Sequence, residues 1–371
     1  MADQRKKILF LVPSLEGGGA ERVFVTLLRH LNREKFELHL GLLEAAGPYL
    51  TEVPSDVQVH VLNVSRVRYA IPAIVRLVWQ LRPATVISTP VNLNLFVAAS
   101  KLLWPRGIRL FIRESITLSR FLDEEMRHPA FWKFSYRSLY RRADAIVCLC
   151  SVMSRDLIES FGIPSAKMRQ IYNPVDSERL RTLVEGSGNP YQTARPNLVA
   201  VGRLESQKGF DLLLDAMATV SRICLTAHLT ILGEGPLRES LEKQRDRLNL
   251  TSSVRLLGFQ ENPFPYYRWA DLFVLVSKYE GLPNTMLEAI ALGTPVLAAD
   301  CVGGVREVAE LFPEKSFLCE RSSSAVASRI LDLCKNGCRT ESFVENAPLR
   351  FESNFGVHAI VRKYEKLLGP D

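Results

Sequence analysis

Four charged side chains in the second half of the sequence stand where a parallel sheet would present them to a ligand. Arg203 and Lys208 closely follow one apolar, strand-like run, and Glu280 and Glu288 follow another. The carboxyl ends of parallel strands meet at one edge of a sheet, where open α/β sheets bind their ligands. Two fixed cations at such an edge suit a diphosphate, which arginine binds bidentately and lysine as a point charge. The spacing therefore indicates a site for an anionic ligand.

Each of these residues also has a purely structural explanation. Glutamate is common in the first turns of a helix, because its charge complements the helix macrodipole, and this alone could account for Glu288. Arg203 and Lys208 could be solvated loop cations. Glu280 is harder to explain in this way, because a loop needs only turn residues where Glu280 stands before Gly-Leu-Pro. At the level of single residues both interpretations stay open.

The segment around the two glutamates is predicted to be a strand, a loop, a helix and a second strand. The strand Leu272–Val276 leads into a loop whose Gly281 lets backbone amides approach a bound group. Asn284 is the expected N-cap, Thr285 opens the helix, and Gly293 ends it in the left-handed conformation. The donors of the helix N-terminus are thus expected at the same edge as the carboxylates.

Two further segments have glycine-rich turns between a strand and a helix. Gly18 and Gly19 follow the strand-like run Ile8–Val12, where such a turn can bring backbone N–H groups onto a phosphate. This is not the dinucleotide fingerprint, because Arg22 stands in the place of its last glycine. The second turn, Leu232–Pro236, could form a wall of a nucleoside pocket.

Strand and helix patterns alternate along most of the chain, which predicts an α/β fold with parallel, doubly wound sheets. A length of 371 residues exceeds what one hydrophobic core usually sustains. Residues 185–196 have the glycine and proline content of a linker. We expect a first domain over 1–184, this linker, a second domain over 197–355, and a C-terminal helix over 356–371 that packs back on the first domain. The expected helices include Pro72–Leu81, Ser151–Ser160, Gly209–Val220 and Pro236–Leu248.

Composition is that of a soluble globular protein, with 47% hydrophobic and 23% charged residues. No apolar stretch approaches the roughly 18 residues of a membrane span, and the N-terminal apolar run is too short for a signal peptide. A cytoplasmic protein is therefore expected. The seven cysteines form no CxxC pair and no histidine-bearing pattern, so no metal site is expected.

Positive charge is concentrated in the first half of the chain. Residues 1–176 contain 24 Lys and Arg against 16 Asp and Glu, which favours an anionic partner for this half. Within residues 119–142 aromatic and basic residues interleave at helical spacing, which suits an interfacial helix on anionic lipid. A helix with aromatics in the core and a solvated basic face has the same pattern. Nucleic acid is not an expected partner, because no recognised binding module accompanies the charge.

Several of these segments, in this order, resemble the motifs of the GT4 glycosyltransferases, which are retaining enzymes with the GT-B fold that use nucleotide sugars. The resemblance covers nearly the whole chain, and it implies two Rossmann-like domains that face a central cleft. The matching segments are Gly17-Gly19-Ala20-Glu21-Arg22, Asn173-Pro174-Val175-Asp176, Gly202-Arg203-Leu204 with Lys208-Gly209, Leu232-Gly233-Glu234-Gly235-Pro236, and Glu280-Gly281-Leu282-Pro283 with Glu288-Ala289.

By this resemblance the second domain holds the sugar nucleotide. Arg203 and Lys208 would neutralise the diphosphate, Glu288 would bind the ribose, and Glu280 with the neighbouring amides would bind the sugar. The catalytic set is Glu280, Arg203 and Lys208. The donor-binding set is Gly18, Gly19, Gly202, Gly235, Gly281, Leu282, Pro283, Asn284, Thr285 and Glu288. Because cations are present and no Asp-x-Asp motif appears, no metal and no other cofactor is expected.

The first-domain loop departs from the family pattern. Related enzymes often place a histidine there beside the sugar, whereas this loop reads Arg113-Glu114-Ser115-Ile116-Thr117. Arg113, Glu114 and Asn173 are the expected contacts to the sugar or the acceptor.

The resulting hypothesis is a metal-independent, retaining transferase of cell-surface glycan biosynthesis. It would move a hexose or N-acetylhexosamine from a nucleotide sugar, expected to be a UDP-sugar, to a lipid-linked or polysaccharide acceptor. It would work in the cytoplasm, with peripheral contact to the inner face of the plasma membrane. The alternatives are a sugar-nucleotide epimerase on the same architecture and a non-catalytic nucleotide-sugar-binding subunit.

Overall fold

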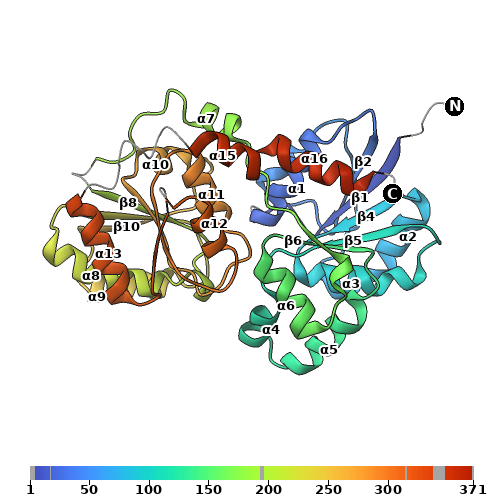
Figure 1. Cartoon of the computed structure of the whole chain (residues 1–371), viewed down its shortest axis with the longest axis horizontal. Coiled ribbons are helices and arrows are strands. Elements are labelled where there is room, and N and C mark those ends of the chain that lie inside the picture. The colour runs from blue at the N-terminus through green and yellow to red at the C-terminus, as the bar shows by residue number, and fades with distance from the viewer. Residues whose placement is uncertain (1–4, 17, 193–195, 314–315, 337–346, 370–371) are drawn as a thin grey trace. The chain divides into compact units, whose positions relative to one another are not determined.

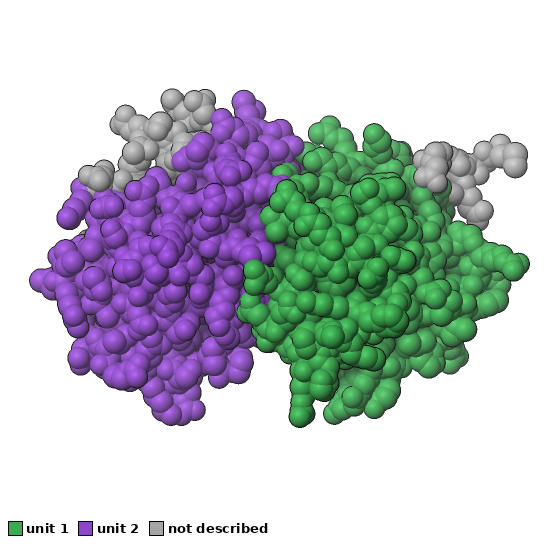
Figure 2. All heavy atoms as spheres, turned by 60° about the horizontal axis from the view of Figure 1, so that its bottom comes forward, with its two compact units in different colours: residues 1–174, 357–371 green, residues 175–356 purple. Residues whose placement is uncertain are grey.

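The chain folds into two compact units, which Figure 2 shows in different colours. Unit 1 consists of Met1–Pro174 with Val357–Asp371, and unit 2 of Val175–Gly356. Each unit is built on one parallel sheet, so the predicted fold class, with two Rossmann-like parallel sheets, is confirmed. The computed structural model describes residues 5–16, 18–192, 196–313, 316–336 and 347–369 (Figure 1).

Within these described ranges, unit 1 contains a seven-stranded sheet with the order β3-β2-β1-β4-β5-β6-β7. Its strand pairs are parallel. The predicted run Ile8–Val12 is fully buried in β1. The strands are β1 (Lys6–Val12), β2 (Phe36–Leu42), β3 (Gln58–Val61), β4 (Thr85–Ser88), β5 (Arg109–Arg113), β6 (Ala145–Cys148) and β7 (Met168–Gln170).

Helices cover both faces of this sheet, and the last helix of the chain is one of them (Figure 1). α16 (Val357–Leu368) packs its buried face into the apolar cluster under α1 (Gly19–His30). The Glu365 carboxylate accepts a hydrogen bond from the Asn32 backbone N–H at 3.0 Å, so the C-terminal helix is fixed to unit 1. The other helices of unit 1 are α2 (Ile71–Leu81), α3 (Val91–Ser100), α4 (Leu118–Glu125), α5 (Pro129–Tyr140) and α6 (Ser151–Phe161), with 3-10 turns at Pro48–Glu52, Val67–Tyr69, Lys101–Leu103 and Ser165–Lys167.

Unit 2 has a sheet with the order β10-β9-β8-β11-β12-β13, also parallel throughout the part that the structure describes. Leucine, isoleucine, valine and alanine side chains of its strands and of α8 and α13 form one buried cluster. The strands are β8 (Asn197–Val201), β9 (His228–Leu232), β10 (Val254–Gly258), β11 (Leu272–Leu275), β12 (Val296–Ala299) and β13 (Ser316–Cys319). The helices are α7 (Ser177–Val184), η5 (Ser206–Lys208), α8 (Phe210–Ile223), α9 (Arg238–Arg247), α10 (Phe264–Trp269), α11 (Asn284–Ala291), α12 (Val305–Leu311), α13 (Ser323–Asn336) and α15 (Ala347–Asn354).

The division between the units falls before the expected linker. α7 belongs to unit 2 because it packs on α10 and α11. At the start of unit 2, the Val175 N–H donates to the Phe355 carbonyl at 2.8 Å. Tertiary packing thus places the boundary at Pro174, although residues 185–196 have the composition of a linker. Residues 193–195 of that linker, and Gly17 of the glycine-rich segment, lie outside the described residues.

Several helix starts differ from the sequence prediction by one or two residues; α2 begins at Ile71 instead of Pro72, and α8 at Phe210 instead of Gly209. α11 begins at Asn284 itself, after Pro283 as N-cap, because Pro283 is extended and no side chain caps the helix. The prediction of Asn284 as the N-cap was therefore wrong by one residue. α9 begins at Arg238, because the N–H of Leu237 is hydrogen-bonded to the Leu204 carbonyl of another loop. The predicted stop at Gly293 is confirmed by its φ of +78°.

Candidate active site

The loops that follow β8, β9, β11, β12 and β13 lie at the same edge of the unit 2 sheet, because these strands are parallel. The residues predicted to bind the donor in this unit come from three of these loops. They are the segments 202–209 after β8, 233–237 after β9 and 276–285 after β11. The topology therefore gathers residues from distant parts of the sequence at one edge.

Lys208 and Glu280 contact each other directly. The Lys208 Nζ lies 2.6 Å from the Glu280 Oε1, and the Ser277 hydroxyl donates to the same oxygen at 2.7 Å. The Glu280 side chain is 8% exposed and the Lys208 side chain 19%. A carboxylate held by an ammonium and a hydroxyl has a fixed orientation, and both charged groups keep a small accessible surface. The structure thus brings together two of the three residues predicted to be catalytic.

The backbone around Glu280 is held by the loop after β12. The Glu280 N–H donates to the Val302 carbonyl at 2.9 Å, and the Gly304 N–H donates to the Gly281 carbonyl at 2.7 Å. Gly303 has a φ of +131°, and a Cβ there would lie 2.0 Å from the Glu280 carbonyl oxygen. The Gly-Gly pair at 303–304 therefore allows two loops to pack backbone against backbone, a role that sequence reasoning did not assign.

Arg203 is placed differently from Lys208. Its side chain is 63% exposed and forms an ion pair with Glu205 at 3.7 Å. An exposed pair of this kind contributes little to stability, so its guanidinium can exchange Glu205 for an anionic ligand at small cost. The neighbouring Gly202 is fixed by its N–H, which donates to the Leu232 carbonyl at 3.0 Å.

Glu288 is buried on α11, and its carboxylate has a partner that the sequence does not reveal. The Tyr267 hydroxyl donates to the Glu288 Oε2 at 3.3 Å, and the Tyr267 ring stacks on Phe273 with centroids 5.3 Å apart. A buried carboxylate needs such donors, because burial without them is costly. Tyr267 and Ser277 are therefore missing from the predicted set; no motif marks them, and only the folded chain brings them to the glutamates.

The start of α11 presents backbone donors near these carboxylates. Gly281, Leu282 and Pro283 are buried, whereas Asn284 and Thr285 are half-buried at the first positions of the helix. The first amides of a helix have no acceptor within the helix, so they favour hydroxyl or phosphate oxygens.

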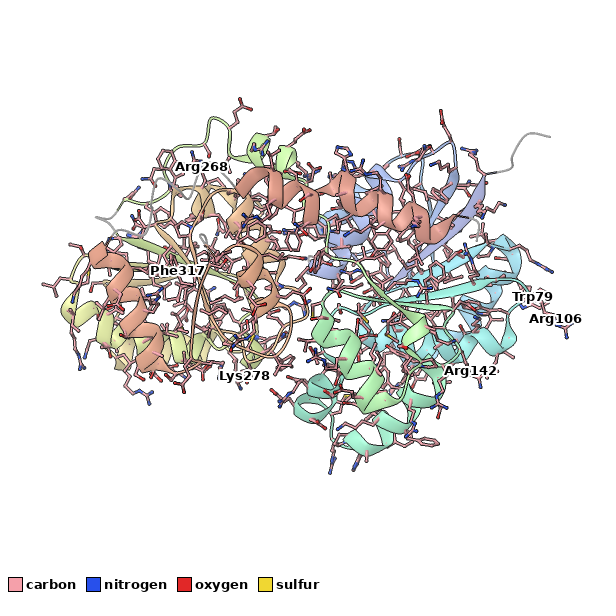
Figure 3. All side chains as sticks on the ribbon, in the orientation of Figure 1. Trp79, Arg106, Arg142, Arg268, Lys278 and Phe317 are labelled. Carbon is pink, nitrogen blue, oxygen red and sulfur yellow. The ribbon has the colours of Figure 1, made fainter. Side chains whose placement is uncertain are left out.

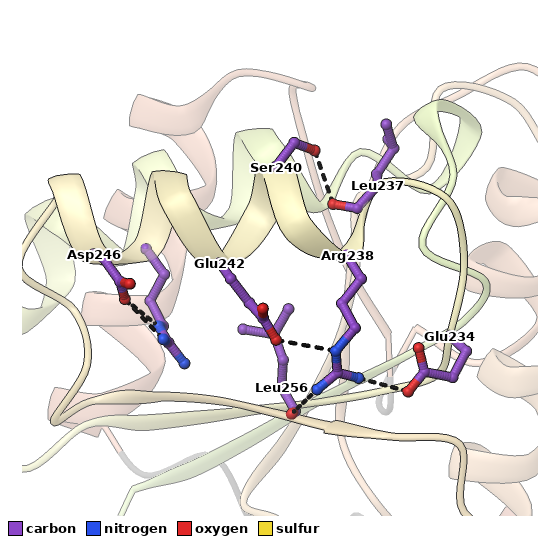
Figure 4. A network of polar contacts seen from close by, with 8 residues as sticks. Glu234, Leu237, Arg238, Ser240, Glu242, Asp246 and Leu256 are labelled. Carbon is purple, nitrogen blue, oxygen red and sulfur yellow. Dashed lines mark hydrogen bonds and ion pairs between the residues drawn. The ribbon is translucent and has the colours of Figure 1, made fainter.

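The glycine-rich turn after β9 packs closely on the loop after β8. Gly233 has a φ of +138°, and a Cβ at Gly235 would lie 2.7 Å from the backbone of Leu204. The Leu204 N–H donates to the Glu234 carbonyl at 2.9 Å. Figure 4 shows how Arg238 holds this turn from the outside: its guanidinium contacts the carboxylates of Glu234 and Glu242 and the Leu256 carbonyl.

Replacing Gly235 with alanine is expected to separate these two loops and to weaken at least tenfold the binding of UDP, the nucleotide that the family resemblance implies. The added Cβ meets backbone, which cannot give way as a flexible side chain can. Isothermal titration calorimetry with UDP measures the effect. The matched control is Gly188→Ala, since a Cβ at Gly188 meets nothing within 4 Å. Equal UDP affinity in the two variants would contradict the predicted role of this turn.

The glycine-rich segment of unit 1 lies at the N-terminus of α1. Gly18 is the N-cap of this helix and Gly19 its first residue, and neither is buried. The Arg22 guanidinium donates to the Tyr49 hydroxyl at 2.6 Å and lies over its ring. Arg22 thus fixes the first turns of the helix.

Arg113 and Glu114 are both buried in unit 1, at 1% exposure each. Arg113 donates to the side chain of Asn173, and the Glu114 Oε1 accepts from Tyr140 and, at 3.0 Å, from Asn94. These hydrogen bonds pair several polar atoms of the group within the unit, whereas the Arg113 Nε and the Glu114 Oε2 have no hydrogen bond among the described residues. The role of Arg113, Glu114 and Asn173 as contacts to the sugar or the acceptor stays a prediction.

One oxygen of this buried group lacks a hydrogen bond. The Glu114 Oε2 has no partner among the described residues. Burial raises the pKa of the Glu114 carboxyl to about 7, against the hydrogen bonds from Tyr140 and Asn94, which lower it. The carboxyl therefore gains or loses its proton near neutral pH, so the stability of unit 1 depends on pH in this range.

Metal binding and thiol chemistry both depend on how His, Cys, Asp and Glu side chains are placed. Within the described ranges, no three His, Cys, Asp or Glu side chains are grouped so that they could hold a metal ion. Cys301 lies on the loop after β12, where burial raises the pKa of its thiol to about 12. The thiol is neutral at pH 7, and a neutral thiol is a poor nucleophile.

Comparison with known proteins bears on both units. The family described as Glycosyltransferase Family 4 matches residues 17–179, and the one described as Glycosyl transferases group 1 matches residues 195–336. Among solved structures, the Anabaena protein HepE in complex with UDP and glucose aligns with a TM-score of 0.78 at 20% identity, over 98% of this chain and 99% of that chain.

Two named relatives cover most of the chain. An amylovoran biosynthesis glycosyltransferase of Erwinia amylovora is 23% identical over 367 residues, which is 98% of this chain and 99% of the relative. The N-acetylgalactosamine-N,N'-diacetylbacillosaminyl-diphospho-undecaprenol 4-alpha-N-acetylgalactosaminyltransferase of Campylobacter jejuni is 30% identical over 313 residues, which is 82% of this chain and 83% of the relative. With this identity and coverage, and with both units matched by glycosyltransferase families, the chain belongs to the family 4 glycosyltransferases.

Proposed function

We propose that the chain transfers a hexose or an N-acetylhexosamine from a UDP-sugar to a lipid-linked or polysaccharide acceptor, with retention of configuration. The observation that carries this proposal is the contact of Lys208 and Ser277 with Glu280 at the carboxyl edge of the sheet. Two relatives support the substrate classes. The Campylobacter jejuni enzyme is named for transfer of N-acetylgalactosamine to a diphospho-undecaprenol-linked sugar, and HepE was solved with UDP and glucose.

In this proposal Lys208 and Arg203 act on the leaving group. The anomeric C–O bond to the diphosphate breaks, and the acceptor oxygen bonds to the anomeric carbon from the same face. The acceptor proton passes to the departing phosphate oxygen. Negative charge on the diphosphate is largest late in this process, so fixed cations stabilise the transition state more than the bound substrate.

The two glutamates bind the neutral parts of the donor. Glu280, with the amides after Gly281, holds the sugar hydroxyls, and Glu288 holds the ribose hydroxyls. Gly18, Gly19, Gly202 and Gly235 are proposed as further donor contacts because each lets backbone approach a ligand closely. Since Arg203 and Lys208 already supply positive charge, the proposal requires no metal ion and no other cofactor.

A turnover assay with UDP-, GDP- and ADP-sugars tests the proposal. We expect release of UDP with a glycan acceptor, at the same rate with and without EDTA. Nuclear magnetic resonance of the product is expected to show the anomeric configuration of the donor. Inversion, loss of activity in EDTA, or epimerised sugar nucleotide without an acceptor would each contradict a separate part of the proposal.

Contact of unit 1 with a membrane surface is a further part of the proposal. The aromatic residues of 119–142 divide into two groups: Tyr136 and Tyr140 are buried, whereas Phe131 and Phe134 are 63% and 69% exposed on α5. The buried pair anchors the helix, and the exposed pair lies among basic residues such as Arg137. No helix of the described part is long and apolar enough to cross a bilayer. This surface supports attachment to an anionic lipid surface rather than insertion.

Vesicles test this attachment. We expect the protein to float with phosphatidylglycerol vesicles at low salt and to be released at high salt, because the Debye length shrinks from about 10 Å at 0.1 M to about 3 Å at 1 M. The double variant Phe131→Ser, Phe134→Ser should bind at least fivefold less. The matched control replaces two exposed apolar residues of unit 2 with serine. These are Ile223 and Leu225, whose exposures are 61% and 82%. Equal binding by both variants would rule out α5 as the lipid contact.

A further inference from the structure

Arg321 lies where three loops of unit 2 meet. It follows β13, and its Nε donates to the Val276 carbonyl at 3.1 Å, at the carboxyl end of β11. The contact spans 45 residues of sequence, so it ties together two loops that the chain does not connect locally.

The third loop reaches the same point through Gly209. This residue has a φ of +67°, and a Cβ there would lie 2.5 Å from the Val276 carbonyl oxygen and 2.8 Å from the Arg321 Nη2. The guanidinium therefore packs directly against the backbone of Gly209. A side chain at this position would displace either the carbonyl or the guanidinium.

Arg321 contacts the backbone of Val276 and Gly209, and each of these residues is adjacent in sequence to a residue that contacts the Glu280 carboxylate. Val276 precedes Ser277, whose hydroxyl donates to the Glu280 Oε1 at 2.7 Å. Gly209 follows Lys208, whose Nζ lies 2.6 Å from the same oxygen. Arg321 thus contacts the residues adjacent to both groups that orient this carboxylate.

Three other hydrogen bonds join the loop after β8 to the loop after β11 without Arg321. Lys278, labelled in Figure 3, bonds through its N–H to the Gln207 carbonyl at 2.7 Å and through its Nζ to Ser206. The Gln207 side chain in turn donates to the Tyr279 carbonyl at 2.9 Å. These contacts hold 206–208 against 278–279, but none of them reaches Val276 or Gly209.

We propose that Arg321 is a positioning residue for the Lys208–Glu280 pair. It fixes the Val276 carbonyl and the Gly209 backbone, and through them the distance between the ammonium and the carboxylate. A reactive group needs such support from a second layer of contacts, because small displacements of a catalytic group cost large factors in rate. The effect on turnover rests on the proposed function, whereas the effect on the loops does not.

A double-mutant cycle tests the proposal. Arg321→Met, which removes the charge and the hydrogen bond at similar volume, is expected to lower kcat roughly tenfold to a hundredfold. In a Lys208→Met background the same change should alter kcat less than about twofold, because there is no pair left to position. Arg321→Lys, which keeps a charge and a donor, should recover most of the loss. Equal effects in both backgrounds, or full activity of Arg321→Met, would overturn the assignment.

Hydrogen exchange keeps the proposal testable if no sugar nucleotide is turned over, and Arg321→Lys supplies the comparison with the unaltered chain if Arg321→Met unfolds. In the ligand-free protein we expect the amides of 276–283 to exchange at least tenfold faster in Arg321→Met, and less so in Arg321→Lys. The matched control is Arg222→Met, at the exposed far end of α8. Unchanged exchange in 276–283 would overturn the proposal without touching the proposed function, which is tested by turnover of the unaltered chain.

Discussion

Lys208→Met is expected to lower kcat by two to three orders of magnitude, which corresponds to about 3–4 kcal/mol of barrier. The ammonium is one of two cations placed to meet the charge that grows on the departing diphosphate. Its loss removes an interaction that is strongest in the transition state, so kcat should fall more than donor affinity. Steady-state kinetics with UDP-sugar and acceptor give both quantities.

The same substitution also leaves Glu280 without its ionic partner. The Glu280 side chain is 8% exposed, and breaking a buried pair by removing one member typically costs about 3–5 kcal/mol of stability. The double variant Lys208→Met, Glu280→Gln removes both charges and should regain most of that stability. It should not regain activity. A double variant with restored activity, or Lys208→Met with normal kcat, would show that the ammonium does not act on the leaving group.

Glu114→Gln is expected to stabilise unit 1 above pH 7 and to change it little at pH 5. The pKa of the buried carboxyl is raised from 4.5 to about 7, chiefly by burial. Between these values the folded state keeps a proton that the unfolded state releases. Stability therefore falls as pH rises through this window and is lowest above pH 7, by about 3 kcal/mol in total. Glutamine keeps the shape and cannot ionise, so the decline should disappear.

Urea unfolding at pH 5 and pH 8, followed by tryptophan fluorescence, measures this difference. Three of the four tryptophans, Trp79, Trp104 and Trp132, belong to unit 1, so the signal reports mainly on that unit. The groups that face the carboxyl are Tyr140, Asn94, Arg113 and the more distant Asp156. Glu124→Gln, an exposed carboxylate on α4, is the control. If the natural chain and Glu114→Gln lose stability in parallel from pH 5 to pH 8, another group is responsible.

Much of the fold follows from local pattern. The alternation of apolar runs with helical periodicity predicted α/β units on parallel sheets, because buried strands and amphipathic helices have different residue spacings. The predicted ends of helices and domains were less accurate where contacts with residues distant in sequence determine them. α9 begins late because Leu237 bonds to Leu204, and the boundary between the units falls early because α7 packs on α10 and α11.

The candidate site likewise has residues that the sequence identified and residues that only the folded chain reveals. Sequence alone determined that Lys208 and Glu280 follow strands of one parallel sheet, and topology then requires them to share an edge although 72 residues separate them. Only the tertiary structure decided which groups complete the site, Ser277 at Glu280, Tyr267 at Glu288 and Arg321 at Val276. It also placed Arg113 and Glu114 in the interior. The physical reason is that parallel topology is encoded by periodicity, whereas side-chain contacts between distant loops depend on packing that no local pattern records.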